Sequence, residues 1–227
     1  MYKYDIHTHT SEVSPCGRVN ASEVVKLYKQ AGYKGIVITD HYYKGFFDKI
    51  DLPNWKDRLA QYLKGYRIAY NEGIQLGLTV ILGIELRFID GPSDYLIYGI
   101  DEKFLLENPE LYNLDLKKFR KMIEGKGMLI YQAHPFRDGF TVPGLELLDG
   151  IEIYNGNQKQ NSKNDIAHSF AINNKLKMVS GSDFHIVQDL AKGGVILKEE
   201  VSTPKELADA LRDNKIIQLI INGNYSS

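Results

Sequence analysis

The sequence predicts an α/β fold in which a parallel sheet is built from strands that alternate with helices. Short, continuous apolar runs recur along the chain, which is typical of parallel strands covered on both faces. Amphipathic stretches of helical period lie between these runs, and such alternation is typical of α/β proteins. The number of predicted strands favours a barrel over a doubly wound sheet. In such barrels the chemistry lies at the carboxyl ends of the strands.

The predicted strands begin at the start of the chain. The first, 2–6, places Tyr2, Tyr4 and Ile6 on one face, because side chains alternate with period two along a strand. The later strands are short apolar runs, whose length favours strand over helix. They are 35–39, 79–84, 95–99, 128–133, 150–154, 177–181, 193–197 and 215–220.

The predicted helices lie between these strands and carry apolar residues at helical spacing. In the first of them Ser22 is the predicted N-cap. The longest begins at Asn54, which follows a proline and is also predicted to cap its helix. The predicted helices are 21–31, 54–76, 115–124, 162–174 and 204–213.

Length and composition predict a single domain, which we expect to span residues 1–227. Apolar residues make up 43% of the chain, which is enough for a sizeable core. The net charge of -1 predicts no general affinity for long nucleic acids or anionic membranes. Cys16 is the only cysteine, which excludes an internal disulfide and indicates a reducing, cytoplasmic location. We see no signal-peptide pattern and no apolar run of membrane-spanning length.

Histidine and acidic residues gather at the ends of the predicted strands. His7 and His9 leave the first strand on the same side, because they are two positions apart. If the strands are parallel, the other groups converge on the same face as this pair. His168 differs, because it lies within a predicted helix and is expected at the surface. The other groups are Asp40 and His41 after 35–39, Glu85 after 79–84, Asp94 before 95–99, His134 after 128–133, and Asp183 and His185 after 177–181.

Each of these residues has an ordinary explanation when it is taken alone. Asp40 could cap a helix, Glu85 could pair with Arg87, and His134 could be a loop residue. Together they predict a metal site, because chance does not place such groups at the ends of most strands. The set exceeds the needs of one ion. We therefore expect two or three divalent ions, Zn, Mn or Fe, with Glu85 able to bridge two of them.

Four motifs carry most of these residues. They are the runs 5–10 (Asp-Ile-His-Thr-His-Thr), 39–41 (Thr-Asp-His), 133–135 (Ala-His-Pro) and 180–185 (Ser-Gly-Ser-Asp-Phe-His). Together they resemble the PHP (polymerase and histidinol phosphatase) family of metal-dependent phosphoesterases, and the resemblance covers nearly the whole chain. It implies a distorted (β/α)7 barrel, similar to a TIM barrel, with a cleft for three metal ions.

The resemblance also implies the ligands of each ion. The first ion would take His7, His9, Glu85 and Asp183. The second would take Glu85, His134 and Asp94, the last of which stands where the family usually has a histidine.

The third ion would take His41 and His185. Its remaining family ligand is a histidine or aspartate shortly after the first motif, where this chain offers Glu12 and Cys16 instead. We prefer Glu12, because a thiolate in an open site would be prone to oxidation.

The resemblance implies hydrolysis of a small phosphomonoester, such as histidinol phosphate or a nucleotide, by a metal-activated hydroxide. Asp40 or His185 would assist departure of the leaving group. Arg137 is a candidate phosphate clamp and Arg18 a second one, because the guanidinium fork suits phosphate. The alternative for both arginines is a surface ion pair.

Two other functions stay open at this point. An amidohydrolase-type barrel that cleaves C–N bonds also opens with an H-x-H pair, but it usually has a bridging lysine, which the strand ends here do not offer. A non-catalytic metal-binding regulatory module is the second alternative. The aromatic segment 42–53 could form a lid over the substrate, although packing against the edge of the barrel is the preferred explanation.

Overall fold

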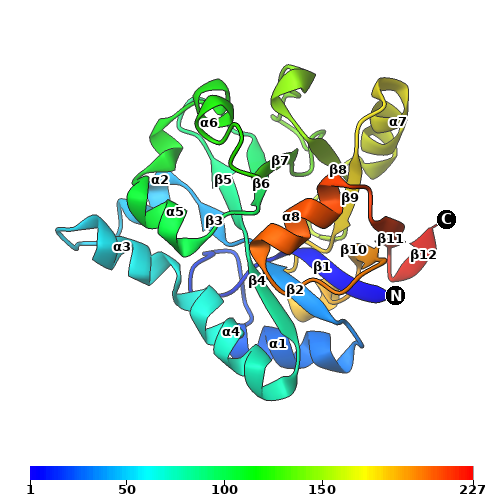
Figure 1. The fold of residues 1–227 in the computed structure, drawn as a ribbon, viewed down its shortest axis with the longest axis horizontal. Helices are drawn as coiled ribbons and strands as arrows, with labels where there is room; N and C mark the ends of the chain where they lie inside the picture. Colours follow the sequence, from blue (N-terminus) through cyan, green and yellow to red (C-terminus); the bar gives the residue numbers. More distant parts are fainter. Residues whose placement is uncertain (227) are drawn as a thin grey trace.

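The computed structural model describes residues 1–226 and shows a mixed α/β fold whose strands form two six-stranded sheets (Figure 1). The first sheet has the order β12 (Asn224–Ser226), β11 (Ile216–Ile221), β10 (Gly193–Leu197), β1 (Tyr2–Thr8), β2 (Gly35–Ile38), β4 (Thr79–Leu82). The second has the order β3 (His41–Tyr42), β5 (Ile84–Arg87), β6 (Asp94–Tyr98), β7 (Leu129–Gln132), β8 (Gly150–Asn155), β9 (Met178–Gly181).

The chain passes from the first sheet to the second at two neighbouring places. β2 pairs with β4 in parallel, and their continuations β3 and β5 pair in parallel in the second sheet. Gly83 lies at the second passage, where a Cβ atom would come within 2.9 Å of Val37 and 3.0 Å of Thr39. The predicted strand 79–84 is therefore divided at Gly83, because the backbone must bend there with no room for a side chain.

The prediction of a purely parallel sheet is wrong, because β6 runs antiparallel to both β5 and β7. The connection from β5 to β6 spans only residues 88–93, which is too short for the helical crossover that a parallel pair needs. The amino end of β6 consequently lies beside the carboxyl ends of β5 and β7. Asp94, the first residue of β6, thus reaches the same edge as residues that follow the other strands.

The closed barrel implied by the family resemblance is not confirmed by the strand pairing of the described residues. The two sheets meet on their other side through an isolated parallel bridge between Thr8 and Phe184, just after β9. The α/β class is confirmed, and the strand ends that carry the candidate site do converge.

Helices α1 and α4 pack side by side and α7 packs against β8, whereas α8 lies across the middle of the molecule, where its apolar residues join a core cluster shared by strands of both sheets (Figure 1). Asn20, rather than the predicted Ser22, caps α1 by accepting a hydrogen bond from the Glu23 amide. The predicted helix 54–76 is divided at Leu63, and Asn54 caps its first part. The helices are α1 (Ala21–Gln30), α2 (Lys44–Phe47), α3 (Trp55–Tyr62), α4 (Lys64–Leu76), α5 (Glu102–Glu107), α6 (Leu116–Met122), α7 (Asn164–Asn174) and α8 (Pro204–Arg212).

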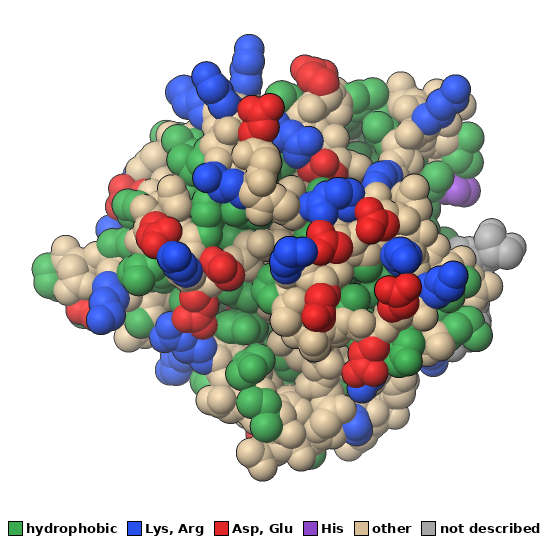
Figure 2. All heavy atoms as spheres, viewed as in Figure 1, with side chains coloured by type: hydrophobic (Ala, Val, Ile, Leu, Met, Phe, Trp, Pro, Cys, Tyr) green, Lys and Arg blue, Asp and Glu red, His purple; other side chains and the backbone are tan. Residues whose placement is uncertain are grey.

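Charged side chains are dispersed over the surface but clustered in the interior. On the face in Figure 2, Lys and Arg side chains are interspersed with Asp and Glu. No helix of residues 1–226 is long and apolar enough to cross a membrane. The interior, by contrast, holds many charged and imidazole side chains at the strand ends, including His7, His9, Glu85, His134 and Asp183, each 2% exposed or less. Buried charges need partners, so this cluster is the natural candidate for a functional site.

Candidate metal centre

His7 and His9 lie at the carboxyl end of β1, and both are fully buried. The Nδ1 atom of His7 lies 2.8 Å from Glu152 Oε1, and the Nδ1 atom of His9 lies 3.0 Å from Ser14 Oγ. Each imidazole is thus held from behind by Nδ1 and turns Nε2 toward a shared space. Histidines that ligate metals in proteins are held in this way.

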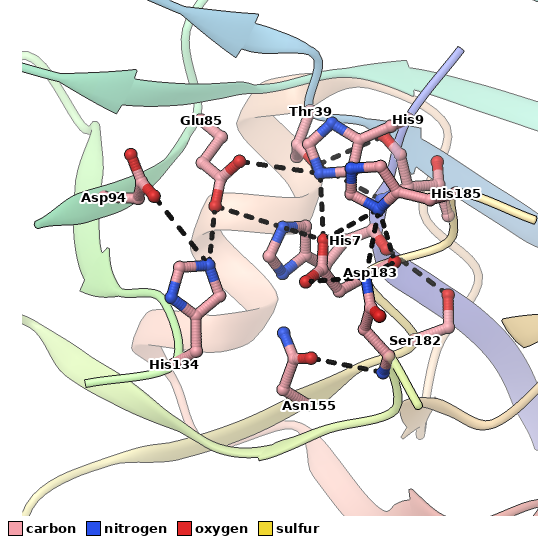
Figure 3. A network of polar contacts seen from close by, with 12 residues as sticks. His7, His9, Thr39, Glu85, Asp94, His134, Asn155, Ser182, Asp183 and His185 are labelled. Carbon is pink, nitrogen blue, oxygen red and sulfur yellow. Dashed lines mark hydrogen bonds and ion pairs between the residues drawn. The ribbon is translucent and has the colours of Figure 1, made fainter. Parts of the chain in front are cut away.

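Four donor groups face one another across that space (Figure 3). Asp183 Oδ1 lies 3.3 Å from His7 Nε2 and 3.2 Å from His9 Nε2. The Glu85 carboxylate lies 3.4 Å from His7 Nε2 and 3.5 Å from His9 Nε2. Donors about 2.1 Å from a tetrahedral ion lie about 3.4 Å apart. The spacing therefore fits one divalent ion.

Hydrogen bonding supports the same conclusion. His7 Nε2, His9 Nε2 and Asp183 Oδ1 are buried and have no hydrogen-bond partner among the described residues. Buried polar atoms without a partner are costly in free energy. Three of them pointing at one space fit a bound cation that would satisfy them all.

A second donor group shares Glu85 with the first. Glu85 Oε1 lies 3.0 Å from His134 Nε2, and Asp94 Oδ2 lies 4.0 Å from the same nitrogen. Glu85, Asp94 and His134 are close enough together to hold an ion. Arg87 holds Asp94 with two hydrogen bonds of 2.7 Å each. We call His7, His9, Glu85, Asp94, His134 and Asp183 the inner group.

The electrostatics of Glu85 and His9 favour the forms that ligate metals. Burial alone would raise the pKa of Glu85, but His41 and His7 outweigh it and hold that pKa well below its usual range. Burial, followed by His185 and His41, holds the pKa of His9 well below its usual range. Glu85 is therefore ionised and His9 neutral at ordinary pH, which are the forms that bind metals.

His7 differs from His9 in this respect. Burial would lower the pKa of His7, but Glu152, Asp183 and Glu85 outweigh it and raise that pKa well above the usual value. The protein without metal therefore carries a proton on His7, and metal binding would release it.

The backbone at the site is strained at two ligand positions. His134 has φ of 31° and Asp183 has φ of 50°, in the left-handed region that non-glycine residues rarely adopt. Each such residue costs about 1–3 kcal/mol and persists where the surroundings over-determine it. Here Glu152 Oε2 accepts a 3.0 Å hydrogen bond from the His134 amide, which helps to hold this conformation.

A further set, the outer group, consists of Cys16, His41 and His185. Cys16 Sγ lies 3.2 Å from His41 Nε2 and 2.9 Å from His185 Nε2. Burial would raise the pKa of the Cys16 thiol, but hydrogen bonds with His185 and His41 outweigh it and lower that pKa to about 6.

A family model described as "PHP domain" matches residues 5–182, and one described as "PHP-associated" matches residues 161–216. The first covers well over half of the chain. The chain belongs to the PHP domain family. No curated protein matches it.

Solved structures show the same fold at low sequence identity. A two-domain protein from Bacteroides vulgatus, described as containing a "predicted PHP-like metal-dependent phosphoesterase", has a TM-score of 0.69 and 19% identity; the match covers 99% of this chain and 66% of that one. PsfC from Pseudomonas syringae has a TM-score of 0.69 and 15% identity over 93% of this chain and 89% of that one. An amidohydrolase from Chromobacterium violaceum has a TM-score of 0.50 and 17% identity over 80% of this chain and 87% of that one.

The structure of this PHP domain separates the two candidates for the third ligand of the outer group. Both carboxylate oxygens of Glu12 accept hydrogen bonds from the Ala21 amide, at 3.1 and 3.0 Å. Glu12 thus stabilises the start of α1, whereas Cys16 Sγ lies within 3.2 Å of both outer imidazoles. The geometry favours Cys16, contrary to the preference drawn from the sequence.

Asp40 also has a different role from the one expected. Its two oxygens accept hydrogen bonds from the Thr10 amide, the Thr10 hydroxyl and the Ser14 hydroxyl, each 2.7 Å long. Ser14 in turn contacts His9 Nδ1. Asp40 therefore positions His9 through Ser14, and its oxygens are already occupied by these donors.

The two arginines expected from the sequence, Arg18 and Arg137, line the same cavity. Arg18, Arg87 and Arg137 line a cavity of about 260 Å³ together with Cys16, His41, Asp183 and His185. Arg137 also donates a 3.1 Å hydrogen bond to Asp183 Oδ2. Tyr43 lines the adjoining pocket, whereas its neighbours Tyr42 and Phe47 are fully buried in the core. His168 is exposed, as predicted.

Sequence reasoning missed three residues that support the site. Glu152 holds His7, Arg87 holds Asp94, and Asn157 donates to the Asp183 carbonyl at 3.3 Å. Glu152 had a detectable signal, because it interrupts the apolar strand Gly-Ile-Glu-Ile-Tyr and a buried glutamate is rarely unpaired. Arg87 and Asn157 had no such signal. The partner of Arg87, Asp94, lies across a hairpin, and the partner of Asn157, Asp183, is distant in sequence.

Proposed function

We propose that this PHP domain is a metal-dependent phosphoesterase that hydrolyses small phosphomonoesters, a class that includes histidinol phosphate and nucleotides. The observation that carries the proposal is the position of Glu85, whose carboxylate is shared by two buried donor groups beside an arginine-lined cavity. A carboxylate shared by two groups of imidazole and carboxylate donors is suited to a pair of divalent ions.

The ligands divide as follows. The first ion would be held by His7, His9, Glu85 and Asp183, and the second by Glu85, His134 and Asp94. Divalent ions in such a pair neutralise charge on the phosphoryl oxygens and lower the pKa of the attacking water. Glu152, Ser14 and Asp40 keep the imidazoles in place, so that little rearrangement is needed when the site is loaded.

The residues around the cavity fit a small anionic substrate. Arg18 and Arg137 present guanidinium groups, which match the oxygens of a phosphate. The cavity of about 260 Å³ is at the small end of ligand sites. The net charge of -1 and the interspersed surface charges offer no track for a long nucleic acid.

The fold alone does not decide between this function and C–N bond hydrolysis, because one structural neighbour is an amidohydrolase. The donor set supports the phosphoesterase. Glu85, rather than a lysine, stands between the two donor groups. The retention of six inner donors, each buried, likewise supports catalysis over a purely regulatory metal site.

The test is hydrolysis of p-nitrophenyl phosphate by metal-stripped protein to which Mn²⁺, Zn²⁺ or Fe²⁺ is returned. We expect turnover with at least one metal and none without, and the same turnover in His168→Ala, which alters an exposed histidine outside the site. A metabolite phosphatase screen under the active condition would then identify the substrate.

Two outcomes would contradict the proposal. Fully metal-loaded protein that hydrolyses no phosphoester would indicate a regulatory module. Cleavage of amides or simple carboxylic esters, with no action on any phosphoester, would favour the amidohydrolase alternative.

A further inference from the structure

The outer group brings together three residues from separate parts of the chain. Cys16 lies on the loop between β1 and α1, His41 begins β3, and His185 follows β9. Cys16 Sγ lies 3.2 Å from His41 Nε2 and 2.9 Å from His185 Nε2. Two imidazole nitrogens therefore point at the only sulfhydryl of the protein.

In His41 and His185 the Nδ1 atom already has a polar neighbour, which leaves Nε2 as the nitrogen that can bind an ion. His185 Nδ1 lies 2.8 Å from the Asp183 carbonyl oxygen, which can only accept, so Nδ1 carries the proton. His41 Nδ1 lies 2.5 Å from Glu85 Oε2, so this nitrogen faces the Glu85 carboxylate as an ion-pair contact. Nε2 is therefore the ring nitrogen that each histidine turns toward Cys16 Sγ, and each would ligate an ion through that atom with release of any proton it carries.

His9 joins the inner group to the outer group. It is fully buried, and its Nε2 has no hydrogen-bond partner among the described residues. Its ring centroid lies 4.4 Å from that of His41 and 4.3 Å from that of His185. These three histidines also form one of the groups whose donor atoms are close enough to share an ion. The outer histidines therefore lie directly beside an inner ligand, within reach of an ion that adjoins the inner group.

We propose that Cys16 takes the place of the histidine or aspartate expected beside His41 and His185 at the third ion implied by the family resemblance, and that its thiolate makes this position select zinc over manganese. A thiolate is a soft ligand, whereas manganese favours oxygen donors, as the carboxylates of the inner group provide. The inference rests on the proposed function in that it adds an ion to the same active site.

The two distances between Cys16 Sγ and the imidazole nitrogens need only a small adjustment to suit zinc. Zinc held by one sulfur and two nitrogens needs roughly 3.5 Å between the sulfur and each nitrogen. Cys16 is exposed, so its side chain can move outward by the few tenths of an ångström required. Glu12, the other candidate, is committed to the amide of Ala21.

Cobalt is the most informative probe, because a thiolate ligand gives cobalt an intense charge-transfer absorption in the near ultraviolet. We expect this absorption in metal-stripped wild type titrated with Co²⁺. It should vanish in Cys16→Ser and persist in the matched control Glu12→Gln. In parallel, the single thiol should react with Ellman's reagent in stripped protein and be protected by Zn²⁺ but not by Mn²⁺.

Variants of the two histidines separate a true site from binding by the thiol alone. The cobalt absorption should be lost or weakened at least tenfold in His41→Gln and in His185→Gln. If the absorption is unchanged in both variants, or is absent from folded wild type, the proposal is overturned. All variants are compared by circular dichroism, so that loss of folding is not mistaken for loss of the site.

These readouts do not depend on turnover. A protein that shows the cobalt absorption but hydrolyses no phosphoester would retain the outer site and contradict the proposed function. A protein that hydrolyses phosphoesters while Zn²⁺ leaves the thiol reactive would support the proposed function and contradict the outer site.

Discussion

The side chains of the inner group are more deeply buried than those of the outer group. His7 and His9 have side chains that are 0% exposed, and each Nδ1 has a buried polar partner. In the outer group His41 is 19% exposed, and Cys16 lies on an exposed loop. The inner donors are therefore pre-organised, whereas the outer donors must move to bind. This difference predicts tight, permanent metal in the inner group and weaker, exchangeable metal in the outer group.

The largest effect is expected from removing an inner donor. Asp183→Ala deletes the carboxylate that faces both His7 and His9, and Arg137 then loses its ion-pair partner. We expect a loss of phosphatase activity of roughly a thousand-fold, because several kcal/mol of charge stabilisation depend on the ion held there. His9→Ala should behave in the same way.

Steady-state assays with p-nitrophenyl phosphate measure this effect, and circular dichroism shows whether the variant is folded. Activity within a few-fold of wild type in a folded Asp183→Ala protein would break the assignment of the inner group. His168→Ala is the matched control.

A smaller effect is expected from loosening the support behind an inner ligand. Glu152→Gln keeps an oxygen for the His134 amide but removes the charge that holds His7. Losses of about 10- to 100-fold in metal affinity or activity are usual for such changes. Competition against a fluorescent chelator measures the affinity. An unchanged affinity would mean that the inner group is not pre-organised by Glu152.

A more modest effect is expected at the cavity wall. Arg137→Lys replaces a two-pronged donor with a point charge, which can still pair with Asp183 but binds phosphate less well. We expect KM for a phosphomonoester to rise about tenfold while kcat changes less. A change confined to kcat would instead give Arg137 a role in holding Asp183 only.

The smallest effect concerns pH and the support behind His9. Burial raises the pKa of Asp40 to about 6, although hydrogen bonds from Thr10 and Ser14 oppose the rise. Since the folded pKa lies above the unfolded value of 3.8, the contribution of Asp40 to stability is fully present below that value. It is lost as the pH rises through about 6.

Asp40→Asn removes this titration. Urea unfolding of both proteins should therefore show the stability of wild type, relative to the variant, declining between about pH 4 and pH 6. Parallel pH profiles would contradict the burial-driven shift.

The sequence predicts most of the inner group because strand periodicity and strand ends determine where His7, His9, Glu85, His134 and Asp183 lie. It also predicts Asp94, but not how that residue reaches the site. Asp94 does so only because β6 runs antiparallel, which the sequence did not predict. The local pattern marks Glu152 as an unusual residue in an apolar strand, but it does not identify His7 as its partner, because that contact depends on tertiary packing.

The loop after β1 shows where prediction from sequence fails. Glu12 and Cys16 lie four positions apart on a loop, where no periodicity determines side-chain direction. Chemical preference alone favoured Glu12. The structure instead turns Glu12 to α1 and Cys16 to His41 and His185.

Anomalous diffraction from crystals grown with zinc tests the central claim most directly, because it locates each ion without reference to activity. We expect one peak within bonding distance of His7, His9 and Asp183, and a second beside His134, with Glu85 between them. Absence of both peaks in crystals that hold zinc elsewhere on the protein would show that the inner group is not a metal centre.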